Sequence, residues 1–291
     1  MNMQNWPHEL MKFLLPDEGY VLYTFDMSQI ENRIVAYVGN VIQMIEAFES
    51  GTDVHSLTAA LIFEKPVDTI SDEPESSALG SGKFSERFWG KKANHALNYS
   101  MSYKTFALKY EIPETQAKWI VERYHLAYPG IRQNYHEMVK LQLSKDRTLT
   151  NLLGRRTLFL DQWGDKLWKA GYSCIPQGTT GDLINERGLS YVYYNQQDFG
   201  PVELLGQVHD SITFQIPLSV PWQRHAGMLK LIKAKLETPL VWRDREFVVP
   251  ADLTMGMSFY KEEGTKVKNI TAEILEGAFN KLCQSGTSKI G

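Results

Sequence analysis

The pattern of apolar and polar positions near the start of the chain predicts a buried strand followed by a helix. Tyr20–Phe25 is a run of β-branched and aromatic residues, which is typical of a strand covered on both faces, and it ends at Asp26. Apolar residues at helical spacing follow from Ser28 until about Gly39. The pattern therefore places a carboxylate between a strand and a helix.

The same reasoning predicts the remaining elements. Helical spacing predicts helices over residues 41–48, 54–63, 85–99, 114–126, 131–145, 166–194 and 222–236. Alternation and turn residues predict a hairpin over 148–160, paired strands over 202–208 and 211–216, and a strand over 248–253. Glu64–Lys83 contains prolines, serines and acidic residues, and it is predicted to be a flexible surface loop or a partly disordered insertion. A helix after Thr271 either packs on the body of the protein or docks on a partner.

Composition excludes some classes and leaves others open. The 291 residues include only two cysteines, Cys174 and Cys283, which indicates a reducing compartment. No apolar run is long enough to span a membrane, so a soluble, cytoplasmic protein is expected, inside a bacterial host cell if the protein is viral. The net charge of −3 weighs mildly against binding to nucleic acid. Two basic clusters, over residues 83–92 and 155–169, keep that possibility open, because counterion release depends on where cations lie.

Asp26 is the first candidate for chemistry. A carboxylate at the end of a buried strand is well placed to hold Mg²⁺, which favours one or two carboxylates together with substrate phosphates. Ser28 and Glu31 also match a capping box, so the same segment is equally consistent with an ordinary helix start.

A basic stripe is the second candidate. Arg87, Lys91, His95 and Tyr99 follow one another at intervals of four, which places them on one helix face. Stacked cations repel unless an anion lies beside them, and a triphosphate fits that requirement. A solvated basic face is the alternative.

The third candidate is the segment Gly206–Ile216, which contains His209 and Asp210 between two strands. A carboxylate at a hairpin tip has rigid support, which suits metal binding. Aspartate is also a common turn residue for purely conformational reasons.

Together these segments resemble the family A DNA polymerases, the bacterial DNA polymerase I class. Asp26-x-Ser-Gln-Ile-Glu-x-Arg33 resembles the first palm motif of that family, and Gln207-Val-His-Asp210 resembles the last. Arg87-x₃-Lys91-x₃-His95-x₃-Tyr99 resembles the fingers-helix motif. Further landmarks occur in the expected order: Asn2–Pro7, Gly51-Thr-Asp-Val-His55-x-x-Thr58-Ala, Tyr128-Pro-Gly130, Leu153-Gly-Arg-Arg156 and Pro176-Gln-Gly-Thr179.

The resemblance implies an α+β fold, with an antiparallel palm sheet, mainly helical fingers and no thumb. It assigns residues 1–38 and 165–262 to the palm, 39–164 to the fingers with a flexible loop over about 64–84, and 263–291 to a tail with a short amphipathic helix. The resemblance covers residues 2 to about 260.

The resemblance also implies a reaction and its metal ions. Template-directed transfer of dNMP from a dNTP to a primer 3′-OH is expected, with two Mg²⁺ ions for which Mn²⁺ can substitute. Asp26, Asp210 and the Met27 carbonyl are the expected metal ligands. Lys91 is the expected proton donor to pyrophosphate.

Nucleotide and DNA contacts follow from the same resemblance. The expected nucleotide-binding residues are Met27, Gln29, Glu31, His55, Arg87, Lys91, His95 and Tyr99, with Glu31 excluding a 2′-OH. The expected DNA-binding residues are Tyr99, Arg156, Lys169, Gln177 and His209, with Gln177 and His209 reading minor-groove acceptors.

Several positions depart from the family pattern. His95 stands where the family has Phe or Tyr, which puts sugar discrimination in doubt. Ser100 replaces a glycine, Ser211 an acid, Glu9 an arginine and Lys169 an arginine.

Thumb and 3′–5′ exonuclease segments are not recognisable, so a partner chain is expected to supply them, as in a split phage-type polymerase; a fragment is the competing explanation. Two other functions compete: an RNA-synthesising relative, and a catalytically idle DNA-binding subunit.

Overall fold

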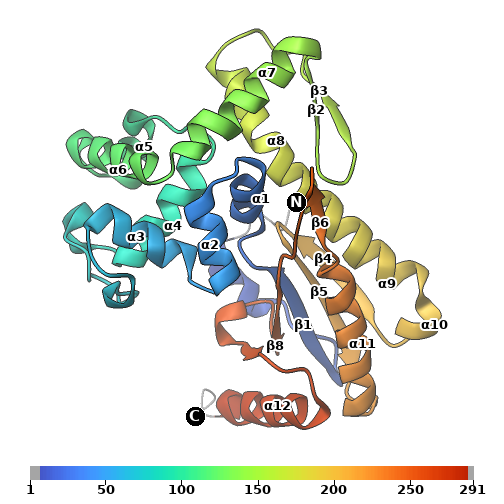
Figure 1. Cartoon of the computed structure of the whole chain (residues 1–291). Helices are drawn as coiled ribbons and strands as arrows, with labels where there is room; N and C mark the ends of the chain where they lie inside the picture. The colour runs from blue at the N-terminus through green and yellow to red at the C-terminus, as the bar shows by residue number, and fades with distance from the viewer. Residues whose placement is uncertain (1–6, 288–291) are drawn as a thin grey trace. The chain divides into compact units, whose positions relative to one another are not determined.

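The computed structural model describes residues 7–287 and divides them into two compact units. One unit combines residues up to Ile30 with those from Thr180 onward, and the other is Glu31–Thr179. Figure 1 shows the elements of each unit, which are described separately below. The Asn2–Pro7 landmark lies outside the described residues except for Pro7.

A five-stranded antiparallel sheet forms the centre of the first unit. Its strand order is β4-β5-β1-β8-β9, and β1 (Tyr20–Met27) lies in the middle. Five consecutive residues of β1, Val21–Phe25, are buried, as its apolar sequence predicts. The neighbours of β1 are β5 (Ser211–Pro217) and β8 (Ala251–Gly256), and the outer strands are β4 (Glu203–Val208) and β9 (Thr265–Val267).

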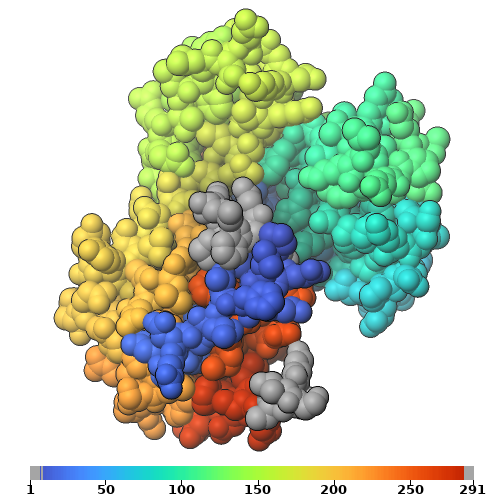
Figure 2. Space-filling model, turned by 180° about the vertical axis from the view of Figure 1, so that it is seen from behind, coloured from blue at the N-terminus to red at the C-terminus, as the bar shows by residue number. Residues whose placement is uncertain are grey.

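Helices and a short hairpin complete the first unit. These elements are a 3-10 helix at His8–Phe13, a π-helix at Ile184–Ser190, α9 (Tyr191–Tyr194), α10 (Gln196–Phe199), α11 (Trp222–Leu236), β6 (Leu240–Trp242), β7 (Arg245–Phe247), a 3-10 helix at Lys261–Glu263, and α12 (Ala272–Thr287). The Phe259 amide donates to the Leu14 carbonyl at 2.9 Å, which joins the N-terminal segment to the residues before α12. Figure 2 shows this N-terminal segment, in blue, lying across the C-terminal residues, in red.

Helix α12 packs on the body of the first unit. Its Leu275, Ala278 and Leu282 are buried, and Phe279 contacts the Trp222 ring of α11 with a centroid separation of 5.5 Å. The packing interpretation of this tail helix is therefore confirmed.

The second unit is mainly helical. Its elements are α1 (Ile30–Val38), α2 (Ile42–Ser50), α3 (Val54–Phe63), α4 (Glu86–Leu97), α5 (Tyr103–Tyr110), α6 (Glu114–Ala127), a π-helix at Ile131–His136, α7 (Glu137–Asp146), the hairpin of β2 (Thr148–Thr150) and β3 (Arg156–Leu158), and α8 (Asp165–Leu183). The unit boundaries fall inside α1 and α8, whereas the sequence placed them at about 38 and 165. The assignment of these units to palm and fingers stays a prediction.

Some elements differ from the sequence prediction. The helix predicted over 166–194 is present as α8, the π-helical segment Ile184–Ser190 and α9, which follow one another without a break. The strand predicted at 248–253 begins at Ala251. Helix α5 and strands β6, β7 and β9 were not predicted, because each is short and has weak periodicity. The helix after Asp26 begins at Ile30 and not at Ser28, since Gln29 has a φ of 51°.

Residues 64–84 contain no α-helix or strand. They include a short 3-10 helix at Val67–Thr69 and a turn at Leu79–Gly82, in which Gly80 and Ser81 have left-handed backbone angles. They are hydrogen-bonded to the start of α4: Ser76 Oγ accepts from the Glu86 amide, and the Ser71 amide donates to the Glu86 carboxylate. The flexibility expected of this loop stays a prediction. Within residues 7–287, no helix has both the length and the apolar character that crossing a membrane requires.

Candidate functional site

The strand pairing of the first unit places the backbones of Asp26 and Asp210 side by side. Asp26 is the penultimate residue of β1, and it pairs with Ser211 of β5 on one side and with Asp252 of β8 on the other. Asp210 lies in the two-residue turn that joins β4 to β5. The Met27 amide donates to the Asp210 carbonyl at 3.0 Å. Backbone hydrogen bonds therefore hold both aspartates at one end of the sheet.

The geometry of this turn explains the sequence around it. His209 has a φ of 51°, a left-handed conformation that tight two-residue hairpins require. Its side chain is exposed, whereas Asp210 is half-buried. Ser211 Oγ donates to the Val208 carbonyl at 2.8 Å, which ties the two ends of the turn together. The residue that replaces the family's second acid thus closes the turn.

A lysine contacts the Asp26 carboxylate. Lys261 Nζ donates to Asp26 Oδ2 at 2.5 Å, and each side chain keeps about 40% of its surface exposed. Sequence reasoning missed Lys261, because it lies in a charged segment with no motif. An ammonium group at this carboxylate shows that a cation fits against Asp26.

The donors at this sheet end suit a hard divalent cation. The carboxylates of Asp26 and Asp210 and the carbonyl of Met27 offer oxygen atoms, the donor type that Mg²⁺ prefers when substrate phosphates complete its shell. Among residues 7–287, no group of three or more His, Cys, Asp or Glu side chains is arranged to hold a metal ion by itself. The residues therefore fit an ion that shares its ligands with a substrate, and not a closed structural site.

In the second unit, a close approach of α3 and α4 creates a cluster of polar side chains. A Cβ on Gly90 of α4 would lie 2.1 Å from the His55 carbonyl oxygen and 2.8 Å from the Ala59 amide of α3. Only glycine permits this contact. The close approach brings Arg87 and Asn94 of α4 next to Asp53 and His55 at the start of α3.

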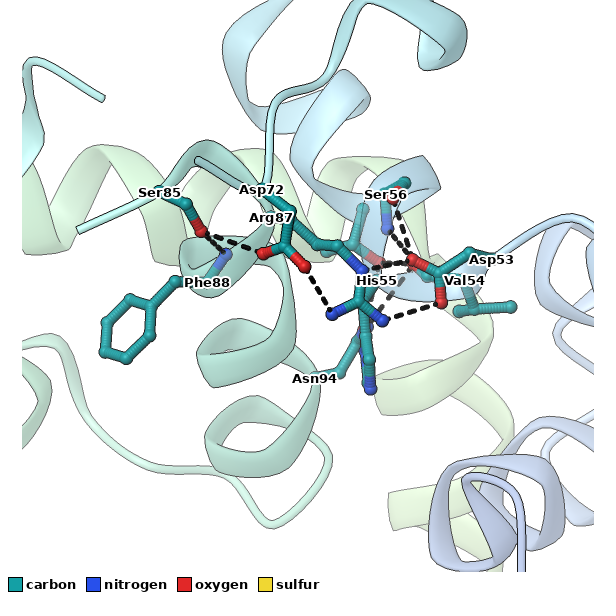
Figure 3. A network of polar contacts seen from close by, with 10 residues as sticks. Asp53, Val54, His55, Ser56, Asp72, Ser85, Arg87, Phe88 and Asn94 are labelled. Atoms are coloured by element: carbon teal, nitrogen blue, oxygen red, sulfur yellow. Dashed lines mark hydrogen bonds and ion pairs between the residues drawn. The ribbon is translucent and has the colours of Figure 1, made fainter. Parts of the chain in front are cut away.

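Arg87 is fixed by Asp53, the residue that caps α3. Arg87 Nε donates to Asp53 Oδ2 at 2.8 Å, and Nη2 donates to Oδ1 at 3.2 Å (Figure 3). The Ser56 amide donates to the same carboxylate at 2.9 Å. Although burial acts to raise it, the pKa of Asp53 lies well below its ordinary value, because Arg87 and Ser56 donate to the ionised form. Asp53 thus closes a helix and orients a guanidinium group.

His55 is buried, neutral and oriented by Asn94. The Asn94 amide Nδ2 lies 3.0 Å from His55 Nδ1, so the histidine accepts there and carries its proton on Nε2 (Figure 3). Burial, together with the charges of Arg87 and Lys91, lowers the pKa of His55 to about 3. At neutral pH this residue is a hydrogen-bond donor without charge.

His95 and Lys91 lie beside this pair. The His95 ring is 5.9 Å from the His55 ring, and partial burial with the charges of nearby lysines lowers the pKa of His95 to about 4. Lys91 is exposed, and no carboxylate in the described chain is within ion-pair distance of its ammonium group. The charge of Arg87 is balanced by Asp53, so the cluster keeps the positive charge of Lys91 beside two neutral imidazoles.

Tyr99 and Glu31 form a separate contact in the same unit. The Tyr99 hydroxyl donates to the Glu31 carboxylate. Burial raises the pKa of Tyr99 well above its ordinary value, and the negative charge of Glu31 adds to the shift. Helix α4 ends at Leu97, so Tyr99 lies in the turn after the helix and not on its face as predicted.

The other predicted DNA contacts in this unit lie on α8 and the hairpin. Arg156 and Gln177 are exposed, and Lys169 is half-buried. Arg155 Nη2 donates to the Gly178 carbonyl at 3.3 Å, and Thr179 Oγ1 accepts from the Leu152 amide at 3.1 Å, so the hairpin is attached to α8 near Gln177.

The predicted residues divide between the two units. Asp26, Met27, Gln29, His209 and Asp210 belong to the first, and Glu31, His55, Arg87, Lys91, His95, Tyr99, Arg156, Lys169 and Gln177 belong to the second. Sequence reasoning did not single out Asp53, although its place in Gly51-Thr-Asp-Val-His55 was a usable signal. Asn94, which contacts His55, and Asp252, which pairs with Asp26, lie in no recognisable motif and could not have been found from the sequence.

Comparison with known proteins gives a consistent result. The model of DNA polymerase family A matches residues 1–260. DNA polymerase I of Pseudomonas aeruginosa is 27% identical over 255 residues, which cover 82% of this chain and 26% of that protein. The Helicobacter pylori enzyme is 30% identical over 227 residues, which cover 74% and 23%. The chain spans about a quarter of the length of these curated relatives.

A solved structure shares the fold. The POL domain of Pol1 from M. smegmatis, in complex with DNA primer-template and dNTP, superposes with a TM-score of 0.73 at 27% identity, and the match covers 90% of this chain and 45% of that one. The α+β class expected from the sequence is therefore confirmed. With a family model matched over most of its length, the chain belongs to DNA polymerase family A.

Proposed function

We propose that this chain is the catalytic part of a template-directed DNA polymerase, which transfers dNMP from a dNTP to a primer 3′-OH. The observation that carries the proposal is the backbone hydrogen bond from Met27 to Asp210, which joins two aspartates from distant parts of the chain at one end of the sheet. Membership of DNA polymerase family A supports the same reaction.

Asp26, Asp210 and the Met27 carbonyl are the proposed ligands of two Mg²⁺ ions. When bound, such ions lower the pKa of the primer hydroxyl and neutralise charge on the triphosphate. The oxygen donors support this role, and so does the cation that already contacts Asp26 in the form of Lys261.

Arg87, Lys91 and His55 are the proposed triphosphate contacts. Arg87 brings a guanidinium held in place by Asp53, and His55 brings a neutral N–H donor held by Asn94. Both are organised before substrate arrives, which lowers the cost of binding. As the primer oxygen forms its bond to the α-phosphorus, the bond to the β-phosphate oxygen breaks. Lys91 then donates a proton to the departing pyrophosphate.

Selection of the nucleotide and of the base pair is assigned to other residues. Glu31 blocks the position of a 2′-OH, and the Tyr99 hydroxyl orients the Glu31 carboxylate by donating a hydrogen bond to it. Gln29 and His95 line the same nucleotide, while Gln177 and His209 read the minor groove of the new pair. Arg156 and Lys169 contact the DNA backbone.

Processive synthesis is proposed to need protein surface beyond these residues, whether from a partner chain or another domain. The net charge of −3 gives little general affinity for duplex DNA, and the part of the Pseudomonas aeruginosa enzyme that matches this chain is 26% of that enzyme.

Primer extension with Asp26→Ala and Asp210→Ala tests the proposal. Both variants should lose extension of a primed template, and the wild-type chain should incorporate dNTPs in preference to rNTPs. Asp244→Ala is the matched control, because it removes an exposed carboxylate from the turn between β6 and β7 of the same unit. Near-full activity of either test variant would show the metal assignment to be wrong.

A further inference from the structure

A pocket lies on the side of α4 away from the Asp53–Arg87 pair. It has a volume of about 410 Å³, within the range of small-molecule sites. One wall is the end of the 64–84 loop and the other is the end of α5. In Figure 3, Phe88, which stacks on one wall of the pocket, points away from Arg87 and Asp53. We call this pocket the aromatic–lysine pocket. Its lining residues are Gly80, Ser81, Lys83, Phe84, Lys109, Tyr110 and Glu111.

Two of the lining residues, Phe84 and Tyr110, are aromatic, and both contact the ring of Phe88. Phe84 stacks on Phe88 with centroids 4.0 Å apart and planes at 6°, and Tyr110 meets Phe88 edge-on at 6.5 Å. Phe84, Phe88 and Tyr110 are only half-buried, so their surfaces are partly accessible to a ligand.

The loop that carries Phe84 packs against Trp89 behind the rings. Gly80, Ser81 and Gly82 all have positive φ values, of 61°, 58° and 73°. A Cβ on Gly80 would lie 2.8 Å from the Trp89 ring, so the backbone packs directly on that side chain. The pocket wall is therefore shaped by the fold before any ligand is present.

Three lysines lie over these rings. Lys83 Nζ is 5.4 Å from the Phe84 centroid, Lys92 Nζ is 5.0 Å from that of Phe88, and Lys109 Nζ is 5.8 Å from that of Tyr110. Such contacts are favourable but weak at exposed sites.

Their positive charge is not balanced by protein. In the part of the chain that the structure describes, no carboxylate forms an ion pair with Lys83, Lys92 or Lys109. Burial lowers the pKa of Lys92, and the charges of Lys91 and Lys109 lower it further, which shows that these cations lie close enough to repel. Glu111 is the one acid in the lining, so the pocket keeps a positive excess.

Cations beside accessible aromatic faces suit a ligand that is both anionic and planar. Single-stranded nucleic acid has this chemistry, since proteins hold its phosphates with basic residues and its bases on aromatic rings. A phosphate alone would leave the rings unused, and an apolar peptide would leave the lysines unused.

We propose that the aromatic–lysine pocket binds one nucleotide of a single DNA strand, with its phosphate at Lys83 and Lys109 and its base against Phe84 and Tyr110. The choice of DNA over RNA rests on the proposed function; the binding itself needs neither metal nor dNTP.

Fluorescence anisotropy with labelled oligothymidylate, in the presence of a chelator, tests the phosphate contacts. Lys83→Ala/Lys109→Ala should bind about tenfold more weakly. The slope of log affinity against log salt should fall by about 0.7, since the two lysines share one phosphate and each neutralised phosphate of a single strand contributes about 0.7. Lys145→Ala/Lys230→Ala is the matched control. It removes the same charge from exposed positions outside the pocket and should bind as the wild type does. Equal loss in both double variants, or no loss in the first, overturns the proposal.

The base contact is tested with two further measurements. Tyr110→Leu should weaken oligothymidylate binding by about fivefold or more. An abasic oligomer should bind the wild-type chain more weakly than oligothymidylate does, by a similar factor. The Tyr110→Leu variant should bind the abasic oligomer as tightly as the wild type does. Thermal unfolding of each variant checks that the fold is kept. An abasic strand that binds the wild type as tightly as oligothymidylate contradicts the base contact. The two proposals can fail separately. If the pocket variants weaken oligothymidylate binding but the wild-type chain does not extend primers, the pocket proposal stands and only the proposed function is contradicted.

Discussion

The end of the sheet in the first unit and the α3–α4 cluster in the second place their charged residues by different means. Asp26 and Asp210 are positioned by their backbones, through strand pairing and the hydrogen bond from Met27. Arg87 and His55 are positioned by other side chains, Asp53 and Asn94. The difference predicts where a substitution changes activity without changing stability. At the sheet end a changed side chain leaves the strand pairing in place and costs at most the partly exposed ion pair with Lys261. In the cluster, each change removes a contact that positions another side chain.

The largest effect is expected for Asp26→Asn, which keeps the size of the side chain and removes its charge. Primer extension should fall by about a thousandfold, because several kcal/mol of charge stabilisation are lost. The free energy of unfolding, measured with urea, should change by less than about 1 kcal/mol, since strand pairing is untouched. A large loss of stability would contradict the idea that the backbone alone positions this residue.

Gly90→Ala should disturb the cluster by forcing α3 and α4 apart. The new methyl group would meet the His55 carbonyl at 2.1 Å, so α3 and α4 must separate. The free energy of unfolding should fall by about 3 kcal/mol. Gly181→Ala is a suitable control, because a Cβ there has no neighbour within 4 Å. Equal stability of the two variants would show that the helices are not in close contact.

The pH dependence of stability should reveal His55. Its pKa is about 3 in the folded protein, below the ordinary value, so the unfolded chain binds more protons as pH falls below about 6.5. This residue therefore lowers the stability by about 2 kcal/mol between pH 7 and pH 5. His55→Gln should reduce the loss between those two pH values by that amount in urea titrations. An unchanged loss would mean that the other buried histidines account for it.

Asp53 allows the two roles of one carboxylate to be separated, with the smallest expected effects. Asp53→Ser keeps an acceptor for the Ser56 amide and loses the charge beside Arg87, whereas Asp53→Ala loses both. Asp53→Ala should therefore be less stable than Asp53→Ser by about 1 kcal/mol. Both should raise the KM for dNTP by about fivefold, since a partly exposed guanidinium loses its partner. Unequal KM values would show that the cap itself positions Arg87.

The sequence predicted the strand of Asp26, the turn of Asp210 and the residues of α3 and α4 well, because each has strong periodicity or a motif. Helix α5 and strands β6, β7 and β9 were missed, since short elements take their conformation from tertiary contacts.

Residues that act through others were also missed. Lys261 and Asn94 gain their importance from partners that are distant in the chain, and no local pattern encodes those contacts. The roles assigned to the predicted site residues stay predictions until activity is measured.

The middle position of β1 has a consequence for synthesis of the protein. On the ribosome, β1 emerges long before β5 and β8, the two strands that cover its edges. The intervening residues, Glu31–Thr179, form a compact unit of their own and can fold meanwhile. Throughout that interval the apolar run Val21–Phe25 has no partner strand, so it is exposed to aggregation and to chaperones. The two aspartates become neighbours only when the hairpin that carries Asp210 has been translated.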